Sequence, residues 1–83
     1  MNSISIKLNT IESIKSFCDI VGKVEYEVDV VRGRYVIDAK SILGLHSLDL
    51  TKPVEVVAHC YTADEYKKFV SDIKESGIEI LGE

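Results

Sequence analysis

Apolar and polar residues alternate at the start of the chain and then change to a helical spacing. The alternation covers residues 4–8, with the period of a half-buried strand. Asn9 and Thr10 interrupt it and offer N-cap side chains. The apolar residues that follow form a helical stripe, namely Ile11, Ile14, Phe17, Cys18 and Val21. We therefore predict a strand and then a helix that ends at Gly22, because helix ends often need a residue with positive φ.

The next segment predicts a β-hairpin. Residues 24–31 carry Val24, Tyr26, Val28 and Val30 on one face and Glu25, Glu27 and Asp29 on the other. Gly33 follows between two arginines, and glycine tolerates the backbone that a tight turn demands. Residues 35–39 then supply the returning strand.

The second half of the chain predicts a short helix and a fourth strand. Apolar residues recur at helical spacing over residues 41–48, which fits a two-turn helix that begins at Ser41. Pro53 closes a loop. Apolar residues alternate again over residues 54–58, which we interpret as a strand.

A final helix begins at a capping box formed by Thr62 and Glu65, whose side chains can each bond the other residue's backbone. Its buried stripe is predicted to consist of Tyr66, Phe69, Val70 and Ile73. Gly77 ends this helix. Residues 78–83 are ambiguous, and either pack as a short extension or fray.

These elements follow the order β-α-β-β-α-β-α, in a single domain of residues 1–83. A four-stranded sheet covered on one face by three helices is an α/β (α+β) fold, a two-layer sandwich. The acidic side chains of the second strand suit a sheet whose other face meets water.

Charge and cysteine usage narrow the class of protein. Ten Lys and Arg oppose fourteen Asp and Glu, so the formal net charge is −4 and the basic field that drives nucleic-acid binding is missing. For this reason we expect no nucleic-acid partner. We also expect no membrane association, because no apolar run approaches the ~20 residues of a membrane span. Cys18 and Cys60 are too few for a disulfide scaffold, and we interpret them as reduced thiols of a cytoplasmic protein.

The chain offers little catalytic or metal-binding chemistry. His59 and Cys60 are neighbours at the end of a predicted strand, so their side chains point to opposite faces and do not act together. No phosphate-binding glycine loop, nucleophile motif or metal-ligand spacing occurs. We therefore expect no enzyme activity, no catalytic residues, no metal and no cofactor.

One segment resembles a known family. The sequence Asp38-Ala-Lys-Ser-Ile-Leu-Gly-Leu-His-Ser-Leu-Asp-Leu50 is similar to the regulatory-serine segment of HPr, the phosphocarrier protein of the sugar phosphotransferase system. The run Ala39-Lys40-Ser41-Ile42-Leu43-Gly44 looks like the Gram-positive version, and a weaker resemblance extends over nearly the whole chain. The resemblance implies an open-faced β-sandwich with antiparallel strands in the order 1-4-2-3. It also implies that Ser41 corresponds to the serine that HPr kinase phosphorylates.

The chain departs from that family at the phosphoacceptor site. HPr carries Gly-Leu-His-x-Arg-Pro between its first strand and first helix, where the histidine accepts phosphate from enzyme I. Residues 7–13 here contain no histidine, arginine or proline, and by residue count the loop is about two residues shorter than in that motif. Thr10 lacks the labile imidazole nitrogen, and Glu12 would repel a phosphoryl group.

The resemblance therefore implies a regulatory HPr-like protein that lacks the active-site histidine and acts through protein contacts. Ser41 is the candidate phosphorylation site, and Ile42, Leu43 and His46 are the candidate partner-binding residues. The implied partners are HPr kinase, a catabolite-type transcriptional regulator or a metabolic enzyme, and we expect a monomer or weak dimer.

Two alternatives remain open. The chain could be a working phosphocarrier with an atypical acceptor such as His46, or an interaction domain that is never phosphorylated. In the latter case Ser41 serves only as an N-cap, which stabilises a helix by about 1 kcal/mol relative to alanine.

Overall fold

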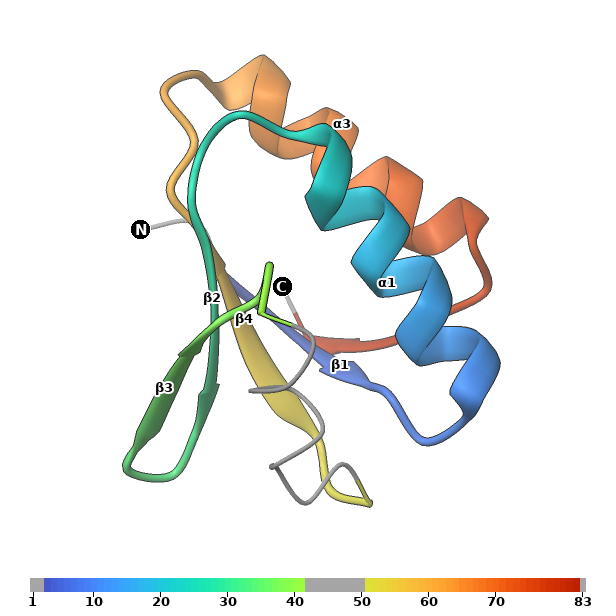
Figure 1. The fold of residues 1–83 in the computed structure, drawn as a ribbon. Helices are drawn as coiled ribbons and strands as arrows, with labels where there is room; N and C mark the ends of the chain where they lie inside the picture. Colours follow the sequence, from blue (N-terminus) through green and yellow to red (C-terminus); the bar gives the residue numbers. More distant parts are fainter. Residues whose placement is uncertain (1–2, 42–50, 83) are drawn as a thin grey trace.

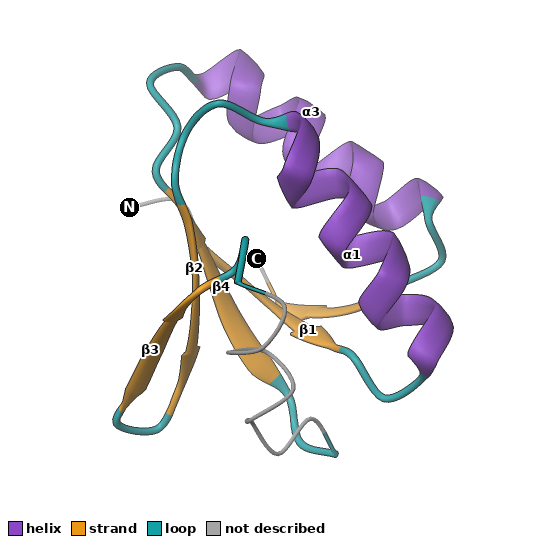
Figure 2. Cartoon of the chain, in the orientation of Figure 1, coloured by secondary structure: helices purple, strands orange, loops and turns teal. Residues whose placement is uncertain are grey.

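The computed structural model describes residues 3–41 and 51–82 (Figure 1). The strands of this part are β1 (Ser3–Lys7), β2 (Val28–Arg32), β3 (Tyr35–Asp38), β4 (Val54–Ala58) and β5 (Glu79–Gly82), and its helices are α1 (Ile11–Lys23) and α3 (Ala63–Glu75). The strands form one sheet, and the two helices lie side by side over one of its faces (Figure 2). The predicted two-layer α+β architecture is confirmed.

The sheet has the strand order β3-β2-β4-β1-β5, and every neighbouring pair is antiparallel. Across the sheet from β1 to β3, the strands follow the order 1-4-2-3 that the resemblance to HPr implies. The hairpin between β2 and β3 turns at Gly33, whose φ of +59° is the left-handed value that favours glycine.

The expected number of four strands is wrong, because residues 79–82 form a fifth. Gly77, at φ +85°, ends α3 and returns the chain toward the sheet. Ile78 is then buried and Ile80 half-buried, and Ile80 lies directly across from Ile6 of β1. Apolar burial and the otherwise unpaired edge of β1 explain why this segment pairs instead of fraying.

Two helices, not three, occur in the described part of the chain. A third helix was predicted over residues 41–48. Residues 42–50 lie outside the described part, so only Ser41 of that predicted helix is described. Neither described helix is long and apolar enough to cross a membrane.

Several predicted boundaries are wrong. The first strand covers Ser3–Lys7 rather than residues 4–8, and β3 ends at Asp38 rather than at residue 39. The first helix continues through Gly22 to Lys23 and ends because Val24 takes an extended conformation, with φ −94° and ψ 150°. The second strand begins at Val28 rather than residue 24, although the predicted faces hold, since Tyr26 is buried while Glu25 and Glu27 are exposed.

The core lies between the helices and the inner face of the sheet. Phe17 and Val21 from α1 meet Phe69, Val70 and Ile73 from α3 over apolar side chains of β1, β2 and β4. Ile11 was expected in the stripe of the first helix but is 76% exposed. It is the first residue of α1, whereas the buried residues of this helix, Phe17 and Val21, lie in later turns.

Candidate functional site

The amino-terminal end of α1 is closed by its own side chains. Thr10 Oγ1 accepts a hydrogen bond from the Ser13 amide at 3.0 Å, and Ser13 Oγ accepts one from the Thr10 amide at 3.1 Å. Glu12 adds a carboxylate to the first turn, where the helix dipole favours negative charge. A further anion at this end would be repelled by Glu12.

Ser41 lies where the chain leaves the sheet after β3. It is exposed, and its amide donates to the Asp38 carbonyl at 2.9 Å, closing a turn. Within that turn the Lys40 amide donates to Asp38 Oδ1 at 2.9 Å, while Ala39 is fully buried. Core packing and hydrogen bonds therefore fix the backbone that presents Ser41 to solvent.

Lys40 connects this turn to the carboxyl end of α1. Its Nζ donates to the carbonyl of Val24, the C-cap of that helix, at 2.9 Å. A cation is favourable there because the helix dipole leaves partial negative charge on the last carbonyls. The two positions of interest thus lie toward opposite ends of α1, with Thr10 at its beginning and the turn before Ser41 at its end.

The three candidate partner-binding residues, Ile42, Leu43 and His46, lie outside the described residues. Of the predicted site, the structure therefore places Ser41 alone.

His59 and Cys60 point to opposite sides of the sheet, as strand alternation predicts. His59 Nε2 lies 2.8 Å from Asp29 Oδ2 on the outer face, so Asp29 has a hydrogen-bond partner as well as contact with solvent. Cys60 packs at the edge of the core, where it shares a hydrogen bond with Tyr26. These neighbours do not form a joint site.

The Tyr26 and Cys60 pair is held in its protonated form. Burial, followed by the hydrogen bond with Cys60, raises the pKa of Tyr26 far above its usual range. Burial also raises the pKa of the Cys60 thiol, although the hydrogen bond from Tyr26 partly opposes that effect. The pKa of Cys18 is likewise raised by burial and by the adjacent Asp19 carboxylate. None of these groups has the lowered pKa of a reactive thiolate.

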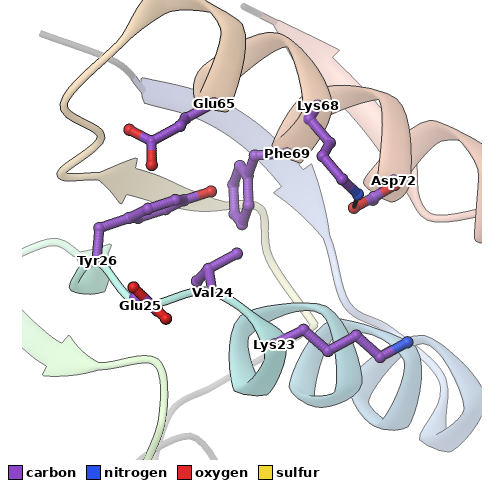
Figure 3. A pocket seen from close by; sticks show the side chains of 8 residues that line it. All are labelled: Lys23, Val24, Glu25, Tyr26, Glu65, Lys68, Phe69 and Asp72. Carbon is purple, nitrogen blue, oxygen red and sulfur yellow. Dashed lines mark hydrogen bonds and ion pairs between the residues drawn. The ribbon is translucent and has the colours of Figure 1, made fainter.

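Sequence reasoning missed a shallow cavity of about 320 Å³ between the carboxyl end of α1 and α3 (Figure 3). Its apolar floor contains Tyr26 and Phe69, whose rings meet edge to face with centroids 6.2 Å apart. Its remaining lining residues are Lys23, Val24, Glu25, Glu65, Lys68 and Asp72. Tyr26 and Phe69 were visible in the sequence only as core residues, because the cavity arises where two distant elements meet.

The charged groups around this cavity are mostly used by the fold. Glu65 Oε1 accepts from the amides of Tyr61 and Thr62 at 2.9 and 3.0 Å, which completes the cap of α3. Lys68 Nζ pairs with Asp72 at 3.1 Å. Over residues 3–41 and 51–82, no group of three or more His, Cys, Asp or Glu is arranged to hold a metal ion. Three of the five charged residues that line the cavity, Glu65, Lys68 and Asp72, are thus bonded within α3 and its cap.

A solved structure shares this architecture. The crystal structure of HPr-C-His from Thermoanaerobacter tengcongensis matches with a TM-score of 0.70 and 23% sequence identity, over 92% of this chain and 93% of that one. The fold is that of HPr. No protein-family model and no curated protein sequence matches the chain.

This fold agrees with the open-faced β-sandwich that the resemblance of residues 38–50 to HPr implies. In this fold Ser41 lies just after β3, Thr10 lies between β1 and α1, and Glu12 lies in the first turn of α1.

Proposed function

We propose that this chain is a regulatory HPr-like protein that acts through protein contacts and is switched by phosphorylation of Ser41. It is not a phosphocarrier and not an enzyme. The observation that carries the proposal is the placement of Ser41, exposed at the end of an anchored turn, in the segment whose sequence resembles the regulatory-serine segment of HPr.

The surroundings of Ser41 support a switch that leaves the fold intact. A phosphate adds a charge of about −1.5 to −2 at pH 7. The buried Ala39 and two hydrogen bonds to Asp38, both donated by backbone amides, hold the backbone that leads to Ser41. Phosphorylation of Ser41 should therefore change the surface that a partner protein contacts, while the structure of the core is preserved.

The end of α1 argues against phosphocarrier activity. A phosphohistidine carrier needs an imidazole nitrogen at a helix amino terminus. Here the cap residue is Thr10, its hydroxyl already accepts from Ser13, and Glu12 brings negative charge. His59, the histidine within the described residues, pairs with Asp29 on the outer face of the sheet.

The partner surface is proposed to begin at Ser41 and to include Ile42, Leu43 and His46. The partners proposed from the resemblance are HPr kinase and a catabolite-type transcriptional regulator or metabolic enzyme. The crystal structure with the same fold carries the name HPr, which supports this class of partner without specifying one.

Two incubations test the proposal. With HPr kinase and ATP, the intact mass should rise by one phosphate, and Ser41→Ala should abolish the rise. With enzyme I and phosphoenolpyruvate the mass should stay unchanged, while authentic HPr in a parallel reaction gains phosphate. An acid-labile phosphate on His46 or His59 in the second reaction would make the chain a phosphocarrier. No phosphate in either reaction would make it an unmodified interaction domain.

A further inference from the structure

The strand β3 forms one edge of the sheet (Figure 1). Two of its apolar side chains are exposed. Tyr35 is 68% and Val36 64% exposed. An edge strand presents backbone groups that can pair with another strand. We propose that β3 is a self-association surface, through which two copies of this chain pair antiparallel about a two-fold axis at Val36.

The backbone of β3 is oriented for this pairing. Arg32 and Tyr35 face each other across a two-residue turn, and such a pair exchanges both hydrogen bonds of the ladder. The alternation then directs the backbone groups of Tyr35 and Ile37 toward β2, and those of Val36 toward the free edge. The amide of Ala39 continues this alternation by donating to Val28 at 2.8 Å. Two Val36 residues can therefore exchange a reciprocal pair of hydrogen bonds.

The side chains of this edge are complementary to themselves. The sequence here is Arg34-Tyr35-Val36-Ile37-Asp38. Antiparallel pairing centred on Val36 sets each arginine opposite the aspartate of the second copy, at both ends of the contact. Between them, Tyr35 lies opposite Ile37 and Val36 opposite Val36. A shift by one residue would set Arg34 opposite Ile37 and lose both charge pairs, so the register is specified.

Asp38 also has a reason to accept a cation from outside. It lies directly across from Asp29 of β2, and like charges in that arrangement are destabilising. His59 Nε2 lies 2.8 Å from Asp29 Oδ2, whereas Asp38 Oδ1 accepts from the Lys40 amide. The arginine of a second copy would supply a full positive charge to Asp38. Because the net charge is −4, two copies of the chain repel each other on the whole. Contact is therefore favoured at β3, where the charges of Arg34 and Asp38 balance.

The occupant is a second copy rather than an open series of subunits. Pairing of β3 with the opposite edge strand, β5, would leave both outer edges free and continue indefinitely, whereas the two-fold contact closes. That edge is also irregular, because the register of β5 on β1 shifts between Ser5 and Ile6. A four-residue strand buries less than the roughly 1,200 Å² of a stable interface, so the dimer is expected at high micromolar to millimolar concentration.

Sedimentation equilibrium of the full chain from micromolar to millimolar concentration tests the proposal by charge exchange. Arg34→Asp and Asp38→Arg should each weaken dimerisation on the order of tenfold, since each sets like charges opposite each other at both ends. An equimolar mixture of the two variants should dimerise again, because every pair is then complementary. Lys67→Asp, on the exposed side of α3, changes the net charge as Arg34→Asp does and should have no such effect.

The mixture separates a lost contact from a damaged fold, since misfolded variants would not restore each other. The proposal is overturned if the wild type stays monomeric at millimolar concentration, or if Arg34→Asp dimerises as strongly as the wild type. It is also overturned if the mixture does not recover, or if Leu81→Asp on β5 abolishes association. The test measures dimerisation and not phosphorylation of Ser41, so its failure would leave the proposed function standing.

Discussion

Phe17 shows how much of the fold depends on single buried side chains. It is fully buried in α1 and lies in the centre of the core between the helices and the sheet. We expect Phe17→Ala to lower the free energy of unfolding by roughly 3–5 kcal/mol, because the ring is lost and a cavity remains. Small domains are stable by about 5–15 kcal/mol, so this change approaches unfolding.

Urea denaturation checks this prediction against Ile11→Ala in the same helix. Ile11 is 76% exposed, and its removal should change stability by no more than about 0.5 kcal/mol. Equal midpoints for Phe17→Ala and the wild type would show that the core is wrongly assigned.

The two thiols predict a loss of stability in alkali. Burial raises the pKa of Cys18 and of Cys60 above the value of 9.0 that the unfolded chain would show. Above that pH the unfolded state loses thiol protons that the native state retains, so stability falls as pH rises from about 9. Urea midpoints measured from pH 8 to pH 10 should decline, and less steeply in the Cys18→Ser/Cys60→Ser variant. Parallel slopes for the two proteins would contradict the shifted thiols.

Among the elements, α3 depends on a complete capping box. Thr62 Oγ1 accepts from the Glu65 amide at 3.1 Å, and Glu65 accepts from the Thr62 amide in return. Thr62→Ala should therefore cost about 1 kcal/mol of unfolding free energy, measured by thermal or urea denaturation. Ser71→Ala on the exposed side of the same helix is the control, and should change stability little. A loss no larger than that of the control would argue against the cap.

The fifth strand predicts that the carboxyl-terminal segment is structural. Deleting residues 78–83 removes the buried Ile78 and uncovers the edge of β1 at Ile6. We expect a loss of about 2 kcal/mol or more, judged from the removal of Ile78 alone. Deleting Glu83 alone is the matched control. If the variant that lacks residues 78–83 has the same urea midpoint as the wild type, β5 contributes nothing to the stability of the fold.

The elements also show what the sequence could and could not predict. Local signals predicted the first strand to within one residue at each end, the cap formed by Thr62 with Glu65, and the turn at Gly33. The pairing of β5 depends on contact with β1, which lies more than seventy residues away in the chain. The cavity lined by Lys68 and the contact of Asp29 with His59 likewise could not be predicted without the tertiary fold, because each joins segments that are distant in the chain.

In the whole molecule, the two ends of α1 are used differently from each other. One end is capped by Thr10 and carries Glu12, and we propose that it does not accept a phosphoryl group from enzyme I. The other receives Lys40, beside the proposed switch at Ser41. We therefore infer that an HPr-like fold has been retained here for its contacts rather than for phosphoryl transfer.

Localisation of phosphate after incubation with HPr kinase and ATP tests this account most directly. The chain should gain one phosphate, fragment masses should assign it to Ser41, and Ser41→Ala should gain none. The amide spectrum of the core should be preserved, since Ser41 is exposed and the backbone before it is anchored. Absence of phosphate, or its assignment to Ser47 or Thr51, would contradict the account.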